Sequence, residues 1–188
     1  MTGVAAGLAV ACAALAAGCA APGDGPVDVP AVDAPPRDAP PPCPARTLEL
    51  GRCATEAGGP CRGTLDEVRR FEPLSAGGEV AVVSGPQGSA MLVFAARTDG
   101  IVAGDPADPV NPNNPLVELV VARDGVEVAI YRGRVGFRDD GAGRLFAAGL
   151  FVITEGEELA GVALVAHGRL TDAAGAGRCG EIDFVAAR

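Results

Sequence analysis

The sequence predicts an all-β protein, a single antiparallel β-sandwich of the Ig-like type with about eight to ten short strands. Apolar residues alternate with a period of two through most of residues 71–188, as they do in half-buried strands. Clusters of Gly, Pro and Asp separate these runs and indicate turns. Hydrophobic residues make up 48% of the 188-residue chain, which is enough for one packed core.

The clearest pair of strands is expected at residues 117–122 and 126–132, on either side of Asp124-Gly125. An Asp-Gly turn between β-branched runs is the strongest short signal for a hairpin. Residues 64–70 fit either a short helix, begun by Thr64 with Glu67 three positions later, or a strand at 68–71. The other strands are expected at residues 47–50, 79–83, 91–95, 134–137, 145–153, 161–170 and 182–186.

The beginning of the chain has the composition of an export signal. Residues 4–17 are all apolar or glycine, a run too short to span a bilayer and typical of a signal-peptide core. Leu15-Ala16-Ala17-Gly18-Cys19 resembles a bacterial lipobox, in which small residues precede a Cys that is acylated after cleavage. We therefore expect residues 1–18 to be a lipoprotein signal peptide and Cys19 to carry a lipid such as palmitate.

Two features depart from the usual lipobox. Leu15 lies four residues before Cys19 rather than three, and residues 1–18 contain no Arg or Lys. The alternative is an ordinary secretory signal, but a cut after Ala21 would place Pro22 beside the cleaved bond. If the host has two membranes, Ala20 after the Cys resembles the signal for transfer to the outer membrane. The expected location is the cell envelope, with the lipid as the contact to the membrane.

Residues 19–45 are expected to form a tether between the signal and the domain at residues 46–188. Nine of the 16 prolines of the chain fall in residues 20–45, and Asp recurs there every four or five residues. Proline removes backbone donors and favours extended polyproline geometry, so this segment predicts a semi-rigid acidic stalk. The alternative is a proline-motif ligand for a partner protein.

Four cysteines remain in the exported chain after Cys12 leaves with the signal and Cys19 takes the lipid. An even number in an oxidising compartment indicates disulfides, and four cysteines allow three pairings. Cys53 and Cys61 flank a stretch that can turn the chain back, which leaves Cys43 and Cys179 to join the start of the domain to its last strand. A zinc site is the rival interpretation, but no pair has CxxC-type spacing.

The charge of the chain narrows the possible partners. The net charge is −9, and all 15 basic residues are Arg, so chemistry that depends on Lys is excluded. An acidic chain without a basic stripe binds nucleic acid poorly, and we expect no nucleic-acid partner. Arg132 and Arg134, and Arg138 with Asp139 and Asp140, are expected to form charge ladders between strands at the surface.

The connection from Asp99 to Pro115 is the leading candidate for a site, because loops of this length in compact domains are usually functional or mobile. It supplies several oxygen ligands of the kind that Ca²⁺ prefers, though their spacing fits no EF-hand. These are Asp99, Asp105, Asp108, Asn111, Asn113 and Asn114. Asp-Pro and Asn-Pro are also ordinary turn starters, which is the competing explanation. The weak metal candidates are Asp105, Asp108, Asn111 and Asn113; otherwise no metal or cofactor is expected.

His167 is the single histidine, and it is the basis of the enzyme hypothesis. It would act as a general base beside Ser84 or Ser89, but neither serine has a nucleophile-elbow G-x-S-x-G around it. A structural histidine in mid-strand is favoured. The acidic turn with Glu155, Glu157 and Glu158 is expected to be a solvated loop rather than a glycosidase carboxylate pair, since sugar sites usually add aromatic platforms.

Three stretches, FEPLSAGGEVAVVSGPQGSAMLVFAAR, VELVVARDGVEVA and LVAHGRLTDAAGAGRCGEIDFVA, cover most of residues 71–188. Together they resemble a group of uncharacterised secreted lipoproteins of GC-rich bacteria with a β-sandwich-like domain. The resemblance implies a β-rich, anchored protein and brings no catalytic residues. The expectation is a lipid-anchored, non-catalytic binding or structural module; the alternatives are an anchored hydrolase with a site near residues 99–115 and a calcium-stiffened adhesion module.

Overall fold

The computed structural model describes residues 38–40, 43, 45, 47–61, 69–85, 88–154 and 158–188. That part of the chain contains ten strands and no helix, which confirms the all-β prediction. The predicted signal peptide, Cys19 and most of the tether lie outside the described residues. The strands are β1 (Glu49–Thr55), β2 (Arg69–Pro73), β3 (Gly78–Ser84), β4 (Ala90–Thr98), β5 (Leu116–Arg123), β6 (Val126–Arg134), β7 (Arg138–Asp139), β8 (Leu145–Thr154), β9 (Ala163–Thr171) and β10 (Gly177–Ala187).

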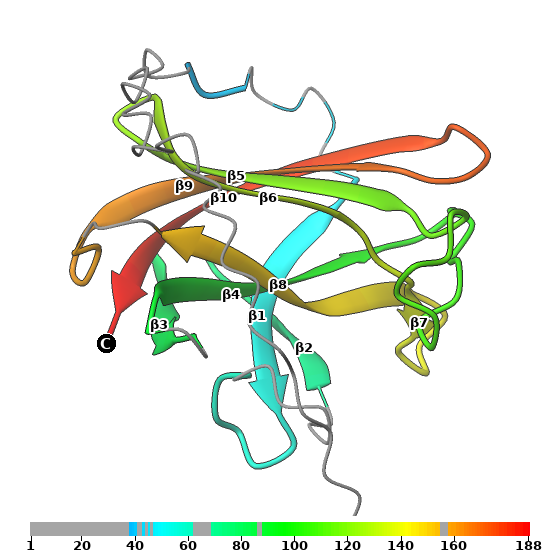
Figure 1. Cartoon of the computed structure of the whole chain (residues 1–188), viewed down its shortest axis with the longest axis horizontal. Helices are drawn as coiled ribbons and strands as arrows, with labels where there is room; N and C mark the ends of the chain where they lie inside the picture. The colour runs from blue at the N-terminus through cyan, green and yellow to red at the C-terminus, as the bar shows by residue number, and fades with distance from the viewer. Residues whose placement is uncertain are drawn as a thin grey trace, which may run out of the picture. The chain divides into compact units, whose positions relative to one another are not determined.

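The strands form two layers that β3 joins into one continuous sheet. One layer has the order β10-β9-β5-β6, and the other contains β2, β1, β4, β8 and β7. Residues 78–81 of β3 pair parallel with β10, and residues 82–84 pair antiparallel with β4. The sheet is therefore mixed, where the sequence predicted antiparallel pairs alone. Figure 1 shows the two groups of strands one above the other, with β9, β5 and β10 in the upper group and β4 and β8 in the lower.

The core lies between the layers, and β4 is buried on both faces. Alternate residues of a strand point to opposite faces, so Leu92, Phe94 and Ala96 join the main core. Val93 and Ala95 face the other way, into a second cluster that includes both cysteines of the Cys53–Cys61 pair. This double burial explains why residues 91–96 form an unbroken apolar run rather than an apolar-polar alternation.

The Asp124-Gly125 hairpin is confirmed. β5 and β6 pair antiparallel, with Arg123 opposite Val126, so two residues form the turn. Both have positive φ, 51° for Asp124 and 80° for Gly125. That backbone geometry matches the right-handed twist of the two strands, which is why this dipeptide sets the register.

Two sequence predictions of local structure meet different outcomes. For residues 64–71, the strand alternative is confirmed from Arg69 onward, because β2 begins there. Residues 62–68 lie outside the described residues.

The strand predicted at residues 134–137 is wrong beyond Arg134. The backbone N–H of Val135 donates to Pro115 O, and that of Phe137 donates to Ala103 O. The alternating pattern is present, but its hydrogen bonds go to the long connection instead of to a strand.

β1 begins against β10, and glycine permits this close approach. The N–H groups of Thr47 and Leu48 both donate to Cys179 O over 2.9 Å. A Cβ on Gly180 would lie 1.8 Å from Leu48 O, so no larger residue fits without moving the backbone. None of the described residues forms a helix long and apolar enough to cross a membrane.

Candidate functional site

A solvent-open hollow of about 500 Å³ lies over β9 and β10 beside the Cys43–Cys179 disulfide. His167 and Arg169 come from the outer face of β9, because Ala166 and Leu170 on the alternating positions face the main core. Its walls combine backbone of the two strands with polar side chains and the disulfide. The lining residues are Cys43, Ala45, Thr47, His167, Gly168, Arg169, Leu170, Thr171, Gly177, Arg178, Cys179 and Gly180.

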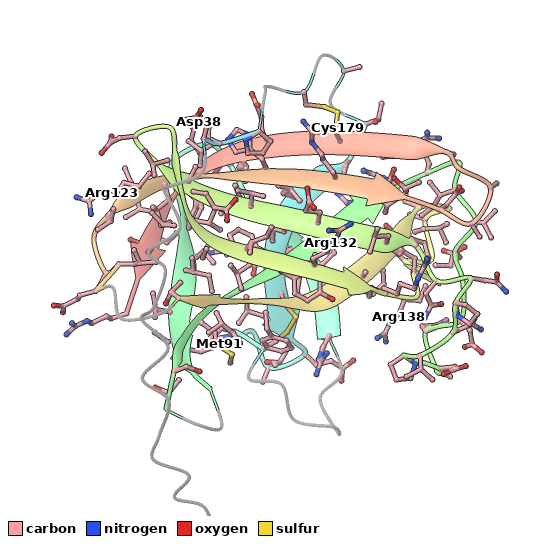
Figure 2. All side chains as sticks on the ribbon, turned by 45° about the horizontal axis from the view of Figure 1, so that its top comes forward. Asp38, Met91, Arg123, Arg132, Arg138 and Cys179 are labelled. Atoms are coloured by element: carbon pink, nitrogen blue, oxygen red, sulfur yellow. A yellow bond between two sulfur atoms is a disulfide. The ribbon has the colours of Figure 1, made fainter. Side chains whose placement is uncertain are left out.

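The described end of the tether is attached to the upper layer at two points. Asp38 forms a β-bridge with Val126, and the N–H of Ala39 donates to Gly125 O over 3.0 Å. Five residues after Asp38, Cys43 is bonded to Cys179 on β10. In Figure 2, Asp38 lies near the end of the layer that carries Arg123, and the labelled Cys179 marks the second attachment. The described end of the tether is thus held against the sheet at Asp38, at Ala39 and again at Cys43.

The structure contains both disulfides that the cysteine spacing predicts. Cys43–Cys179 has a Cα–Cα distance of 5.8 Å and spans 136 positions, while Cys53–Cys61 has a distance of 5.5 Å and spans eight. Disulfides persist in oxidising compartments, so the two bonds indicate an extracytoplasmic location. They also explain the four cysteines without a zinc site; no cluster of His, Cys, Asp and Glu that could hold a metal occurs among the described residues.

His167 has a carboxylate partner but no serine from the sequence hypothesis. Its Nδ1 lies 3.7 Å from Glu181 Oε2 on β10, and the two side chains are 16% and 19% exposed. Ser84 and Ser89 instead lie at the β3–β4 connection, and neither lines the hollow. The separation of 3.7 Å is longer than a hydrogen bond, so the structure places a carboxylate beside His167 but does not bring to it the nucleophile that the sequence suggested.

Charged residues form a row across the outer face next to His167. Arg169 lies directly between Cys179 and Glu118 in the register of β10, β9 and β5. Arg132 on β6 continues the row, with its Nε 3.8 Å from Glu118 Oε2. Arg178 adds a second cation at the hollow, and it donates to Gly100 O at the start of the long connection. The predicted charge ladder is thus present at Arg132, and it continues through Glu118 and Arg169 to the hollow.

Arg134 and Asp140 do not belong to simple surface ladders. Arg134 donates to Asn114 O over 2.7 Å and so supports the long connection. Asp140 accepts from the backbone N–H groups of Ala142 and Arg144, and its Oδ2 lies 3.6 Å from Arg97. The N–H of Ala142 is the main cause that lowers the pKa of Asp140, and the neighbouring guanidinium groups act in the same direction.

Residues 105–114 form a spiral of turns with a period of three. An Asp or Asn starts each turn, a Pro follows it, and the same type of residue returns three positions later. Each starting C=O accepts the N–H three residues on, at 3.1–3.3 Å. The side-chain Oδ1 of the Asp or Asn that begins each turn accepts the backbone N–H two residues later, which makes an Asx turn. These side-chain acceptors are Asp105, Asp108 and Asn111, over 2.9, 3.1 and 2.9 Å.

These turns account for most of the calcium candidates without a metal. Asp105, Asp108 and Asn111 each direct one oxygen at their own backbone, and Asn113 is an exposed turn residue. The competing interpretation, turn starters, therefore describes what these residues do. A calcium contribution stays testable by melting the protein with and without EDTA, which is expected to give the same midpoint if the turns alone fix the loop.

The residue that organises this connection is Asn114, for which the sequence suggested a calcium ligand and not this structural role. Asn114 is fully buried; its Oδ1 accepts from Asp105 N over 2.7 Å and its Nδ2 donates to Asp108 O over 2.8 Å. The side chain thereby closes the two ends of the spiral on each other. The period-three repeat of Asx residues was visible in the sequence and is the signal that would have found it.

Asp172 fixes the other end of the connection. Its Oδ2 accepts the N–H of Val102 over 2.7 Å, and its Oδ1 accepts the N–H groups of Ala174 and Ala176. The bond from Val102 is the largest of the effects that lower the pKa of this buried carboxylate, and Arg178 adds a favourable charge. The connection is therefore held at both ends by polar side chains.

The acidic turn can be followed only at Glu158, since Glu155 and Glu157 lie outside the described residues. Glu158 is exposed and forms an ion pair with Arg188 at the end of the chain. An exposed pair of this kind is expected to contribute little to stability, in agreement with a solvated loop.

The fold and the hollow define a class: an all-β, disulfide-bonded extracytoplasmic protein. Comparison with protein-family models gives no match, and comparison with curated protein sequences gives no relative. The function is therefore inferred from the chain's own residues.

Proposed function

We propose that this chain is a lipid-anchored, non-catalytic β-sandwich module of the cell envelope that acts as a binding or structural element in the outer membrane. The lipid on Cys19 is its contact to the membrane, and a protein or envelope component is its partner. Residues 20–45 serve as a proline-rich acidic spacer, which projects the domain away from the bilayer.

The observation that carries this proposal is the Cys43–Cys179 bond. It ties the proline-rich segment to the last strand, 136 positions away in sequence. A spacer that is only a disordered leader needs no covalent attachment to the body. A spacer that transmits position from a membrane to a domain gains from one, because the bond fixes the point where the domain is held.

The experiment is metabolic labelling with an alkyne-tagged fatty acid in a bacterial host that lipidates exported proteins. The chain is expected to take up label, and Cys19→Ser is expected to abolish it. Cys12→Ser is the matched control and is expected to keep the label, because Cys12 lies inside the apolar run of the signal. A wild-type chain that is exported but never labelled contradicts the proposal.

One observation favours a second candidate, an anchored hydrolase. His167 lines a solvent-open hollow, and the Glu181 carboxylate lies 3.7 Å from its Nδ1. Against it stands the position of Ser84 and Ser89, which lie at the β3–β4 connection and do not line the hollow. A hydrolase predicts turnover of generic esters or amides that His167→Gln removes, whereas a binding module predicts none in either protein.

A further inference from the structure

The two disulfides differ in their access to solvent. Cys53 and Cys61 are 2% and 0% exposed and lie within an apolar cluster. Cys43 and Cys179 are only half-buried, and both line the open hollow of about 500 Å³. Thiol–disulfide exchange requires a thiolate to reach a sulfur atom in line with the bond, so access separates the two bonds chemically.

The charges around Cys179 favour its departure as a thiolate. Arg169 is its direct cross-strand neighbour, and Arg178 precedes it in β10. Arg169 and Arg178 both line the hollow together with His167. Nearby cations stabilise a thiolate, and exchange is faster when the leaving sulfur is more acidic.

The bond also holds a segment that adds little to the core. Cys43 belongs to no strand, and in the described part of the tether the remaining attachment to β6 is one bridge at Asp38 with the bond from Ala39 to Gly125. On the domain side, Thr47 and Leu48 are fixed independently by their bonds to Cys179 O. Breaking the disulfide therefore removes the main tie on the tether and leaves the ten strands joined as before.

We propose that Cys43–Cys179 is a reducible clasp that sets where the tether leaves the domain, and that its reductant is a protein dithiol. One thiolate of the dithiol attacks the Cys43 sulfur. The S–S bond breaks, Cys179 leaves as a thiolate, and a mixed disulfide forms on Cys43. The second thiol of the partner then displaces Cys43. Two electrons pass to the clasp, two protons end on the cysteines, and the partner leaves as a disulfide.

Opening the clasp changes the reach of the tether. With the clasp closed, the described tether is fixed to the domain from Asp38 onward. Once the clasp is open and the single bridge at Asp38 and Ala39 releases with it, the first fixed residue is Thr47, nine positions later. At about 3.1 Å per residue this adds roughly 28 Å to the distance between anchor and domain. This consequence depends on the proposed lipid anchor, but the exchange reaction does not.

The test uses the full chain with Cys19→Ser, exposed to a thioredoxin-type dithiol protein and quenched with a maleimide. We expect Cys43 and Cys179 to be alkylated at least about tenfold faster than Cys53 and Cys61. Hydrogen exchange at the same time points is expected to show lost protection at Ala39 and retained protection in β9 and β10. Reduction of both disulfides together, or only as the strands lose protection, overturns the proposal.

Matched variants separate the chemistry from a change in stability. Arg169→Gln is expected to slow reduction of the clasp several-fold, while Arg132→Gln, in the same row but away from Cys179, leaves the rate unchanged. Equal rates in both variants contradict the role given to the cations. Cys43→Ser with Cys179→Ser provides the open state; if that protein does not fold, a folded open state is excluded and the proposal fails. Absence of fatty-acid label on Cys19 would refute the anchor and leave these rates as they are.

Discussion

The side chain of Asn114 accepts a hydrogen bond from the backbone N–H of Asp105 over 2.7 Å, nine positions earlier, and no part of this asparagine is exposed. Its amide group donates in turn to Asp108 O. One buried side chain thus closes the spiral of turns that fills the long connection, so the connection is an ordered element rather than a slack loop.

Asn114→Ala is therefore expected to destabilise the protein by about 1–3 kcal/mol, because the N–H of Asp105 loses its acceptor and the C=O of Asp108 keeps only the N–H of Asn111. Denaturant unfolding measures the change. Asn113→Ala is the matched control on the exposed side of the same turn, with an expected change within about 0.5 kcal/mol. Equal effects of the two substitutions would contradict the closing role of Asn114.

Gly180→Ala is expected to cost about 3 kcal/mol or more, because the added methyl group meets the carbonyl oxygen of Leu48. Gly177→Ala on the same strand is the control, since the nearest atom to its Cβ, Leu170 O, is 4.0 Å away. Thermal melting of both variants checks the difference. If Gly180→Ala has the same melting temperature as the wild type, the close approach of β1 to β10 is not as described.

Arg97 joins several elements at the other layer. Glu49 accepts from its Nε and Nη2 at 2.9–3.1 Å, and its guanidinium lies 4.2 Å from the centre of the Phe71 ring. Arg97→Lys keeps the charge but loses the paired hydrogen bonds and the stacking, so a loss of about 1–2 kcal/mol is expected. Arg132→Lys alters an exposed pair at 3.8 Å and is expected to change stability by less than about 0.5 kcal/mol. Indistinguishable unfolding midpoints for the two variants would refute this difference.

Asp172 makes stability depend on acid pH. Its pKa lies below the ordinary value in the folded protein, chiefly through the N–H of Val102, so its contribution is complete above the unfolded pKa and is lost as the pH falls through the folded pKa. Asp172→Asn is expected to melt below the wild type at neutral pH, and the gap is expected to narrow as the pH falls into the acid range, where the wild-type carboxyl becomes protonated in the folded protein as well. Asp183→Asn, an exposed carboxylate of β10, is the control. A gap of constant size across this range would show that ionisation of Asp172 is not involved.

Local pattern was sufficient to predict much of the fold. The alternation of apolar residues predicted the all-β class, and the Asp124-Gly125 turn predicted the hairpin of β5 and β6, because both depend on the geometry of neighbouring residues. The spacing of the four cysteines predicted both disulfides, since a turn-forming stretch made Cys53 and Cys61 close. The same reasoning placed a strand at residues 134–137, where the periodicity is present but the hydrogen-bond partners are not.

Only the tertiary structure decided which distant residues meet. The first half of β3 pairs with β10 and its second half pairs with β4, and no local feature of the sequence specifies this change of partner. Asn114 is buried because the spiral folds over it, and His167 meets Glu181 because β9 and β10 pair in one register. The sequence by itself determined which segments extend and turn, since those choices are made within a few residues. The hollow and its clasp arise from contacts across more than a hundred positions, which local chemistry does not encode.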